Sequence, residues 1–173
     1  MKTLLILRHG KAQPDAPDGD HARELTDRGA RDSQAIGDYI RQVAGTPDAI
    51  ITSDAQRALQ TAEIVADATG YDGELTLVPR IYQADLRTLL ALVRSILDEV
   101  DTALVCGHNP GFEELVAALA GIDEDDVRLP TAAVAHLEFD VPRWDDAREG
   151  TARWRGIVSP KSLRAAAEEE EEA

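Results

Sequence analysis

Two histidines stand where a sheet protein carries its reactive side chains. His9 follows the first apolar run of the chain, and His108 follows a later one. Each has a glycine neighbour, Gly10 or Gly107, and a glycine lets backbone approach a ligand closely because it has no Cβ. In open parallel sheets, functional groups collect at the carboxyl ends of the strands. We therefore predict that His9 and His108 lie at the same rim of one sheet.

Two arginines are predicted at this rim as well. Arg8 directly precedes His9, and Arg57 follows residues 53–56, which match a capping box with Ser53 as the N-cap. Arg57 then lies in the first helical turn, where free N–H groups and the helix dipole favour an anion. Guanidinium groups suit phosphoryl oxygens, and a histidine that attacks phosphorus supplies nucleophilic catalysis.

The other two histidines lack this setting. His21 lies in a polar loop, and His136 lies inside a predicted strand without a neighbouring glycine, so we expect neither to contact substrate. Residues 13–24 of the loop are the only candidate cover for the rim. The loop carries three aspartates but not the downstream glutamate of a calcium-binding hand, which favours a solvated loop over a metal site.

Three segments around these residues resemble the signature segments of the histidine phosphatase superfamily. They span residues 7–12, 52–62 and 107–110. The form Arg-His-Gly-Lys-Ala and the short chain are most similar to the SixA-type phosphohistidine phosphatases, over about residues 3–160. The resemblance implies a phosphoglycerate mutase-like fold and a phosphorylated nucleophile at His9. It also implies that the phosphoryl group is held by Arg8, Arg57 and His108.

The sequence lacks an acid that many superfamily members carry after the third strand, where it protonates the leaving oxygen. Residues 79–85 contain no glutamate, and Asp85 is only a candidate substitute, with water as the other proton source. SixA-type members resemble this chain in lacking the acid and in having a tyrosine like Tyr82. An alkoxide needs a proton as it leaves, whereas imidazole has a conjugate-acid pKa of about 6.5. We expect cleavage of P–N bonds and poor activity on alkyl phosphates.

The elements that must position these residues alternate along the chain. Apolar runs predict strands over residues 3–7, 49–52, 75–78, 102–106, 132–139 and 153–158. Helical patterns between them begin near residues 26, 53, 86 and 111, and the third extends its apolar positions to Val100. The order β-α-β-α-β-α-β-α-β-β predicts an α/β fold, a three-layer α/β/α sandwich with a mostly parallel central sheet.

Length and charge limit the organisation further. The chain has 173 residues and a formal net charge of -15, with 43% hydrophobic and 29% charged residues, as in a soluble globular protein. We expect one domain over residues 1–162 and an acidic, disordered tail over residues 163–173. The acidity argues against nucleic-acid binding, so positive charge for an anionic substrate must be concentrated locally.

No apolar stretch is long enough for a membrane span, and the apolar run at the N-terminus is too short for a signal peptide. We therefore expect a cytoplasmic protein without membrane partners. The single cysteine, Cys106, excludes an internal disulfide and is interpreted as a small buried hydrophobe.

Three functions fit these observations. The favoured one removes phosphate from phosphohistidine in a protein, such as a histidine-containing phosphotransfer domain. The second hydrolyses a small phosphorylated metabolite or nucleotide, and the third is a non-catalytic phosphate-binding module. The presence of both His9 and His108 argues against the third, because binding alone needs only arginines. None of these reactions requires a cofactor or a metal.

Overall fold

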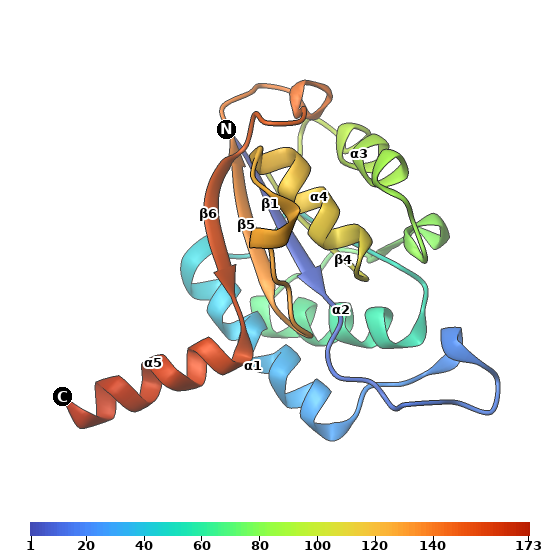
Figure 1. Ribbon diagram of the computed structural model, residues 1–173, viewed down its shortest axis with the longest axis vertical. Coiled ribbons are helices and arrows are strands. Elements are labelled where there is room, and N and C mark those ends of the chain that lie inside the picture. The colour runs from blue at the N-terminus through green and yellow to red at the C-terminus, as the bar shows by residue number, and fades with distance from the viewer.

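The first apolar run forms β1 (Lys2–Arg8), the strand on which the sheet is built in the computed structural model, which describes residues 1–173 (Figure 1). The strand order is β3-β2-β4-β1-β5-β6, in which β1 pairs in parallel with β4 and antiparallel with β5. The other strands are β2 (Ala49–Thr52), β3 (Thr76–Leu77), β4 (Thr102–Gly107), β5 (Val134–Phe139) and β6 (Arg153–Val158). The predicted mostly parallel sheet is confirmed, with antiparallel pairing at β5 and β6 only.

Helices cover both faces of the sheet (Figure 1). They are α1 (Asp27–Ala44), α2 (Gln56–Thr69), α3 (Leu86–Arg94), α4 (Gly111–Ala120) and α5 (Pro160–Glu172). Because successive side chains of a strand point to opposite faces, Leu4 and Ile6 belong to the core under α3 and α4, whereas Leu5 and Leu7 belong to the core under α1 and α2. A strand buried on both faces must be apolar throughout, which explains the uninterrupted run in the sequence. The three-layer α/β/α sandwich is confirmed.

Cys106 lies in the core under α1 and α2 and has no exposed surface. Burial raises the pKa of its thiol to about 12, because the thiolate would lose its hydration. The interpretation of Cys106 as a buried hydrophobe is confirmed. None of the helices combines the length and the apolar character that a membrane crossing requires.

Two predicted helix boundaries are wrong. Ser53 is not the N-cap of α2, which begins at Gln56 after Ala55, and the Ser53 hydroxyl instead accepts a hydrogen bond from the Ala55 N–H. The third helix ends at Arg94 rather than continuing to Val100. There the hydroxyl of Ser95 bonds back to a carbonyl of the last turn, a local hydrogen bond that competes with the helical pattern.

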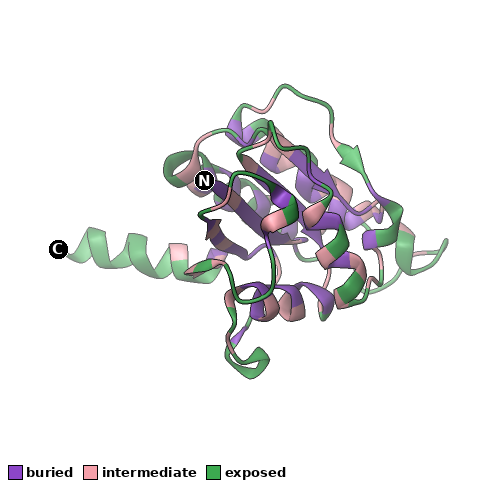
Figure 2. Cartoon of the chain, turned by 90° about the horizontal axis from the view of Figure 1, so that it is seen from above, coloured by how far each residue is buried: buried purple, intermediate pink, exposed green.

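The acidic tail is a helix rather than the predicted disordered segment. Ser159 and Ser162 form a capping box around Pro160, and the alanines and glutamates that follow are strong helix formers. Arg164 anchors α5 to Asp32 of α1 through a 3.0 Å ion pair. Beyond this contact, α5 projects from the sandwich and is exposed all round (Figures 1 and 2).

Candidate active site

The two histidines that follow strands are neighbours in space. In the parallel pairing of β1 with β4, Arg8 is level with Gly107, so the next residues, His9 and His108, leave the sheet side by side. The His9 N–H donates to the Gly107 carbonyl at 3.1 Å, and the centroids of the two imidazole rings are 5.2 Å apart. The predicted placement of His9 and His108 at one rim is confirmed.

The flanking glycines have a different role from the predicted one. A Cβ on Gly10 would lie 2.7 Å from the Gly29 carbonyl oxygen of α1, and a Cβ on Gly107 would lie 2.6 Å from the ring of Phe112. These glycines therefore allow α1 and α4 to pack closely against the strand ends. The expectation that they leave space for a ligand is wrong, because protein atoms fill that space.

The hydrogen bonds of His9 determine which ring nitrogen is free. Nδ1 lies 2.7 Å from the Gly10 carbonyl oxygen, which can only accept, so Nδ1 carries the proton. Nε2 accepts a hydrogen bond from Nε of Arg57 at 3.3 Å. The lone pair of a neutral imidazole is therefore at Nε2, on the side of the arginine.

Both rings are held neutral near pH 7. Burial lowers the pKa of His9 to about 4, with a further contribution from the positive charge of Arg57, and only 8% of His9 is exposed. Burial, followed by the charges of His9 and Arg57, lowers the pKa of His108 to about 3. His108 contacts the Ser53 hydroxyl through Nε2 at 2.8 Å, whereas its buried Nδ1 has no hydrogen-bond partner. His108 thus leaves one buried ring nitrogen unpaired beside His9.

Arg57 lies in the first turn of α2 as predicted, although the cap differs, and it is 6% exposed. Arg8 donates from Nη1 to the Leu129 carbonyl at 3.2 Å, and its buried Nε has no partner. Burial lowers the pKa of Arg8, and the nearby Arg57 adds to this effect. Two partly desolvated guanidinium groups thus face one region, which is the electrostatic condition for binding an anion.

A cavity of about 280 Å³ lies against these groups, and we call it the phosphoryl pocket. It is lined by Arg8, His9, Lys11, Ala12, Arg23, Arg57, His108, Asn109 and Thr131. Four of these residues are cationic and none is acidic. Positive charge is therefore concentrated locally in a chain of net charge -15. Lys11 belongs to a segment that the sequence singled out, but nothing in the sequence pointed to Arg23.

A second cavity of about 540 Å³ adjoins the first at Arg57, His108 and Asn109, and we call it the leaving-group cavity. Its wall carries three carboxylates: Asp20, Asp85 and Glu114. Asp85 caps α3 and accepts the Thr88 N–H at 2.8 Å, and hydrogen bonding to Thr88 lowers its pKa. Asp85 is therefore ionised and badly placed to act as a proton donor.

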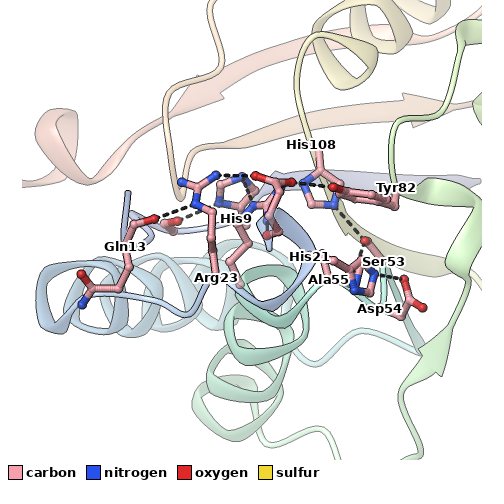
Figure 3. A network of polar contacts seen from close by, with 12 residues as sticks. His9, Gln13, His21, Arg23, Ser53, Asp54, Ala55, Tyr82 and His108 are labelled. Carbon is pink, nitrogen blue, oxygen red and sulfur yellow. Dashed lines mark hydrogen bonds and ion pairs between the residues drawn. The ribbon is translucent and has the colours of Figure 1, made fainter. Parts of the chain in front are cut away.

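Three further residues of the site were missed as contacts by sequence reasoning, and Figure 3 shows their network. Tyr82 places its ring edge-on to His108, with centroids 5.5 Å apart, and its hydroxyl donates to Asp20 at 2.5 Å. The Ser53 hydroxyl bonds His108 at 2.8 Å. The sequence indicated Tyr82 only through family resemblance, and it indicated the loop of Asp20 only as a candidate cover.

The remaining histidines lie outside both cavities. His21 pairs with Asp54 at 2.9 Å and packs edge-on against Tyr82, so it supports the outer side of the site. His136 lies within β5 and faces Glu138 at 3.6 Å. No group of three or more histidine, cysteine, aspartate or glutamate side chains is arranged to hold a metal ion.

Comparison with known proteins agrees with this arrangement. The model of the histidine phosphatase superfamily (branch 1) matches residues 4–87. An uncharacterized protein of Mycobacterium tuberculosis is 32% identical over 165 residues, which are 90% of this chain and 100% of that protein. The phosphohistidine phosphatase SixA of Escherichia coli is 28% identical over 165 residues, which are 94% of this chain and 97% of that protein.

A solved structure of the protein histidine phosphatase SixA complexed with tungstate matches with a TM-score of 0.81 at 26% identity. The match covers 93% of this chain and 99% of that one. The chain belongs to the histidine phosphatase superfamily. It has the phosphoglycerate mutase-like fold and is a phosphatase of this superfamily.

Proposed function

We propose that the protein removes phosphate from phosphohistidine in a phosphoprotein and that His9 carries the phosphoryl group between the two chemical steps. One observation carries the proposal: the lone pair of a neutral His9 lies at Nε2, beside a pocket with four cationic side chains and no acid. A nucleophile must be unprotonated to attack, and the anionic phosphoryl oxygens need positive charge around them.

In the first step, Nε2 of His9 attacks phosphorus as the bond from phosphorus to the substrate imidazole breaks. The bonding pair returns to the substrate ring, which leaves as neutral imidazole when its other nitrogen carries a proton. Arg8 and Arg57 stabilise the charge on the transferring oxygens, and His108 can donate to one of them. In the second step, water attacks the phosphorylated His9, which releases orthophosphate and restores the neutral ring.

The choice of phosphohistidine is supported by the acid groups beside the site. The lowered pKa of Asp85 leaves it ionised, without a proton to donate, and the raised pKa of Tyr82, chiefly due to its hydrogen bond to Asp20, makes the phenol a weaker acid. An alkoxide leaving group needs such a proton, whereas imidazole does not. The similarity to proteins named as SixA phosphohistidine phosphatases points the same way.

A second candidate function is hydrolysis of a small phosphorylated metabolite. The leaving-group cavity of about 540 Å³ favours it, because a cavity of this size accommodates a small molecule. On this alternative, a water in the cavity supplies the proton to the leaving oxygen.

The decisive experiment compares a phosphorylated histidine-containing phosphotransfer domain with a panel of metabolite phosphates, using wild type beside His9→Ala. We expect turnover of the domain by wild type, weak turnover of alkyl phosphates and none by the variant. Equal kcat/KM on a phosphohistidine peptide and an alkyl phosphate would exclude the proposed preference.

A further inference from the structure

Every nitrogen of the Arg57 guanidinium already has a partner within the chain. Nε donates to His9 at 3.3 Å, Nη1 donates to the main-chain carbonyl of Asp20 at 2.7 Å, and Nη2 donates to the Asp20 carboxylate at 3.2 Å. Nη1 and Nη2 each keep one further N–H, but a phosphoryl group that binds across both nitrogens competes with Asp20 for them. The side chain proposed to hold substrate is therefore occupied by a residue of the loop over the rim.

The Asp20 carboxylate is bonded as an anionic ligand would be. Besides Arg57, it accepts from Nη1 of Arg23 at 2.9 Å and from the Tyr82 hydroxyl at 2.5 Å. Both arginines line the phosphoryl pocket, and a carboxylate offers them the same planar pair of acceptors that two phosphoryl oxygens offer. Asp20 lines the adjoining leaving-group cavity and thus places negative charge on two of the arginines of the pocket that must accept a dianion.

The loop that carries Asp20 is held mainly by polar contacts, with the edge-on packing of His21 against Tyr82 in addition. Its two ends are joined by the Gln13 N–H and the Glu24 carbonyl at 2.8 Å, and Asp20–Ala22 form a single 3-10 turn without a buried residue. The Asp20 side chain is 50% exposed. A segment with so little apolar burial costs little free energy to displace.

We propose that Asp20 is a specificity-determining residue whose carboxylate competes with the phosphoryl group of the substrate for Arg57 and Arg23. The inference rests on the proposed function, because it takes these arginines as phosphoryl ligands. A small phosphate must displace Asp20 with its own phosphoryl contacts alone. A phosphoprotein gains additional contacts around the rim, which offset the free energy of moving the loop. Asp20 therefore disfavours small phosphates and free orthophosphate more than it disfavours a protein substrate.

The test is calorimetric titration of the full chain with orthophosphate, comparing wild type with Asp20→Ala. Asp18→Ala is the matched control, because it removes the same charge from the same loop and Asp18 has no hydrogen bond or ion pair in the structure. We expect Asp20→Ala to lower the Kd of orthophosphate by at least about fivefold, whereas Asp18→Ala changes it by less than about twofold. Asp20→Asn, which keeps a weaker contact, should fall between the two.

The sign of the effect separates competition from positioning. If Asp20 instead holds Arg57 in place for substrate, Asp20→Ala weakens orthophosphate binding, and the proposal is wrong. An equal gain in Asp18→Ala would assign the effect to overall charge and would also overturn it. The proposal is also wrong if neither wild type nor Asp20→Ala binds orthophosphate.

A kinetic comparison tests the specificity itself. The second substrate is the phosphorylated histidine-containing phosphotransfer domain, called the carrier domain here. In Asp20→Ala, kcat/KM for phenyl phosphate divided by kcat/KM for the carrier domain should rise about fivefold, because the KM for phenyl phosphate falls. An unchanged ratio would contradict the proposal. If neither the wild type nor any variant hydrolyses the carrier domain, the proposed function is wrong. The orthophosphate titration then still decides whether Asp20 competes for Arg57.

Discussion

The two cavities that meet at Arg57 and His108 differ in charge. The phosphoryl pocket is lined by four cationic side chains and no acid, whereas the leaving-group cavity has three carboxylates and one cation, Arg57. Carboxylates around the leaving group repel one that is itself negatively charged. The difference indicates a site that attracts the phosphoryl group on one side and accepts a neutral or cationic leaving group on the other.

The contrast follows from which elements contribute to each wall. The cations come from the end of β1, the loop over the rim and the first turn of α2, whereas Asp85 and Glu114 come from the starts of α3 and α4. Acidic side chains at helix N-termini are stabilised by the helix dipole. The acidic wall is therefore compatible with fold stability as well as with the proposed chemistry.

The largest expected effect is that of removing the nucleophile from the phosphoryl pocket. His9→Ala should lower kcat on the phosphorylated carrier domain by at least ~1000-fold, because no other group in the pocket is placed to form the covalent intermediate. A radiolabelled phosphoenzyme, isolated without exposure to acid, should be detected with wild type and should be absent with this variant. His136→Ala, at a histidine outside the site, serves as the control. Turnover retained in His9→Ala would remove His9 from the mechanism.

Arg57→Ala comes next, because it removes a charge-stabilising donor shared by both cavities. We expect a loss of at least ~2 kcal/mol in transition-state stabilisation, or about 30-fold in kcat/KM. The same substitution at Arg155, an exposed residue of β6, should leave the kinetics unchanged. A loss of less than about threefold would mean that Arg57 does not contact the transferring group.

The burial that keeps His9 neutral should lower the stability of the folded protein at acidic pH. Its pKa is about 4 in the folded chain and about 6.5 in the unfolded chain, so the unfolded state binds the extra proton first as pH falls. His9 should therefore reduce the free energy of unfolding by about 1.5 kcal/mol between pH 6.5 and pH 5. Urea denaturation of wild type and of His9→Gln at both pH values isolates the contribution of His9 to the free energy of unfolding. Equal pH dependence in the two proteins would show that His9 titrates normally.

Neutralising the acidic wall should produce a smaller change in selectivity. Glu114→Gln is expected to raise kcat/KM for 4-carboxyphenyl phosphate about threefold relative to phenyl phosphate, since one repulsive charge is removed from a solvated cavity. Glu170→Gln makes the same charge change on the projecting helix α5 and should have no effect. The same gain in both variants would attribute the selectivity to net charge rather than to the cavity wall.

The smallest effect is expected at Asp85. Asp85→Asn retains the cap on α3 and should change kcat/KM on alkyl phosphates by less than about twofold, because the lowered pKa keeps Asp85 ionised and unable to donate. Thermal unfolding of the variant verifies that the cap is retained. A loss of tenfold or more would identify Asp85 as the missing acid and would remove the main argument for phosphohistidine.

The local sequence pattern was enough to predict the scaffold and the edge of the sheet that carries the two histidines. The apolar run at β1 requires a strand covered on both faces, and parallel strands place His9 and His108 at one edge regardless of loop detail. The local pattern failed where a contact distant in the chain competes with a local one. Residues 53–56 match a capping box, but the Ser53 hydroxyl contacts His108, a residue that is 55 positions away in the chain. Counting acidic charge in the tail likewise overlooked its strong helix formers.

The sequence by itself determined the layered fold, the paired strand ends and the types of residue that meet there, because these depend on periodicity and on the geometry of parallel sheets. Only the tertiary structure decided that Gly10 and Gly107 admit helices rather than ligand, that Nε2 carries the lone pair of His9, and that the Asp20 carboxylate lies on Arg57. Gly10 meets Gly29 of α1, and Arg57 meets both His9 and Asp20, across long stretches of chain that no local pattern relates. The contacts of His9 with Gly10 and of Gly107 with Phe112 are close in sequence, but the backbone and side-chain geometry of the folded chain sets them.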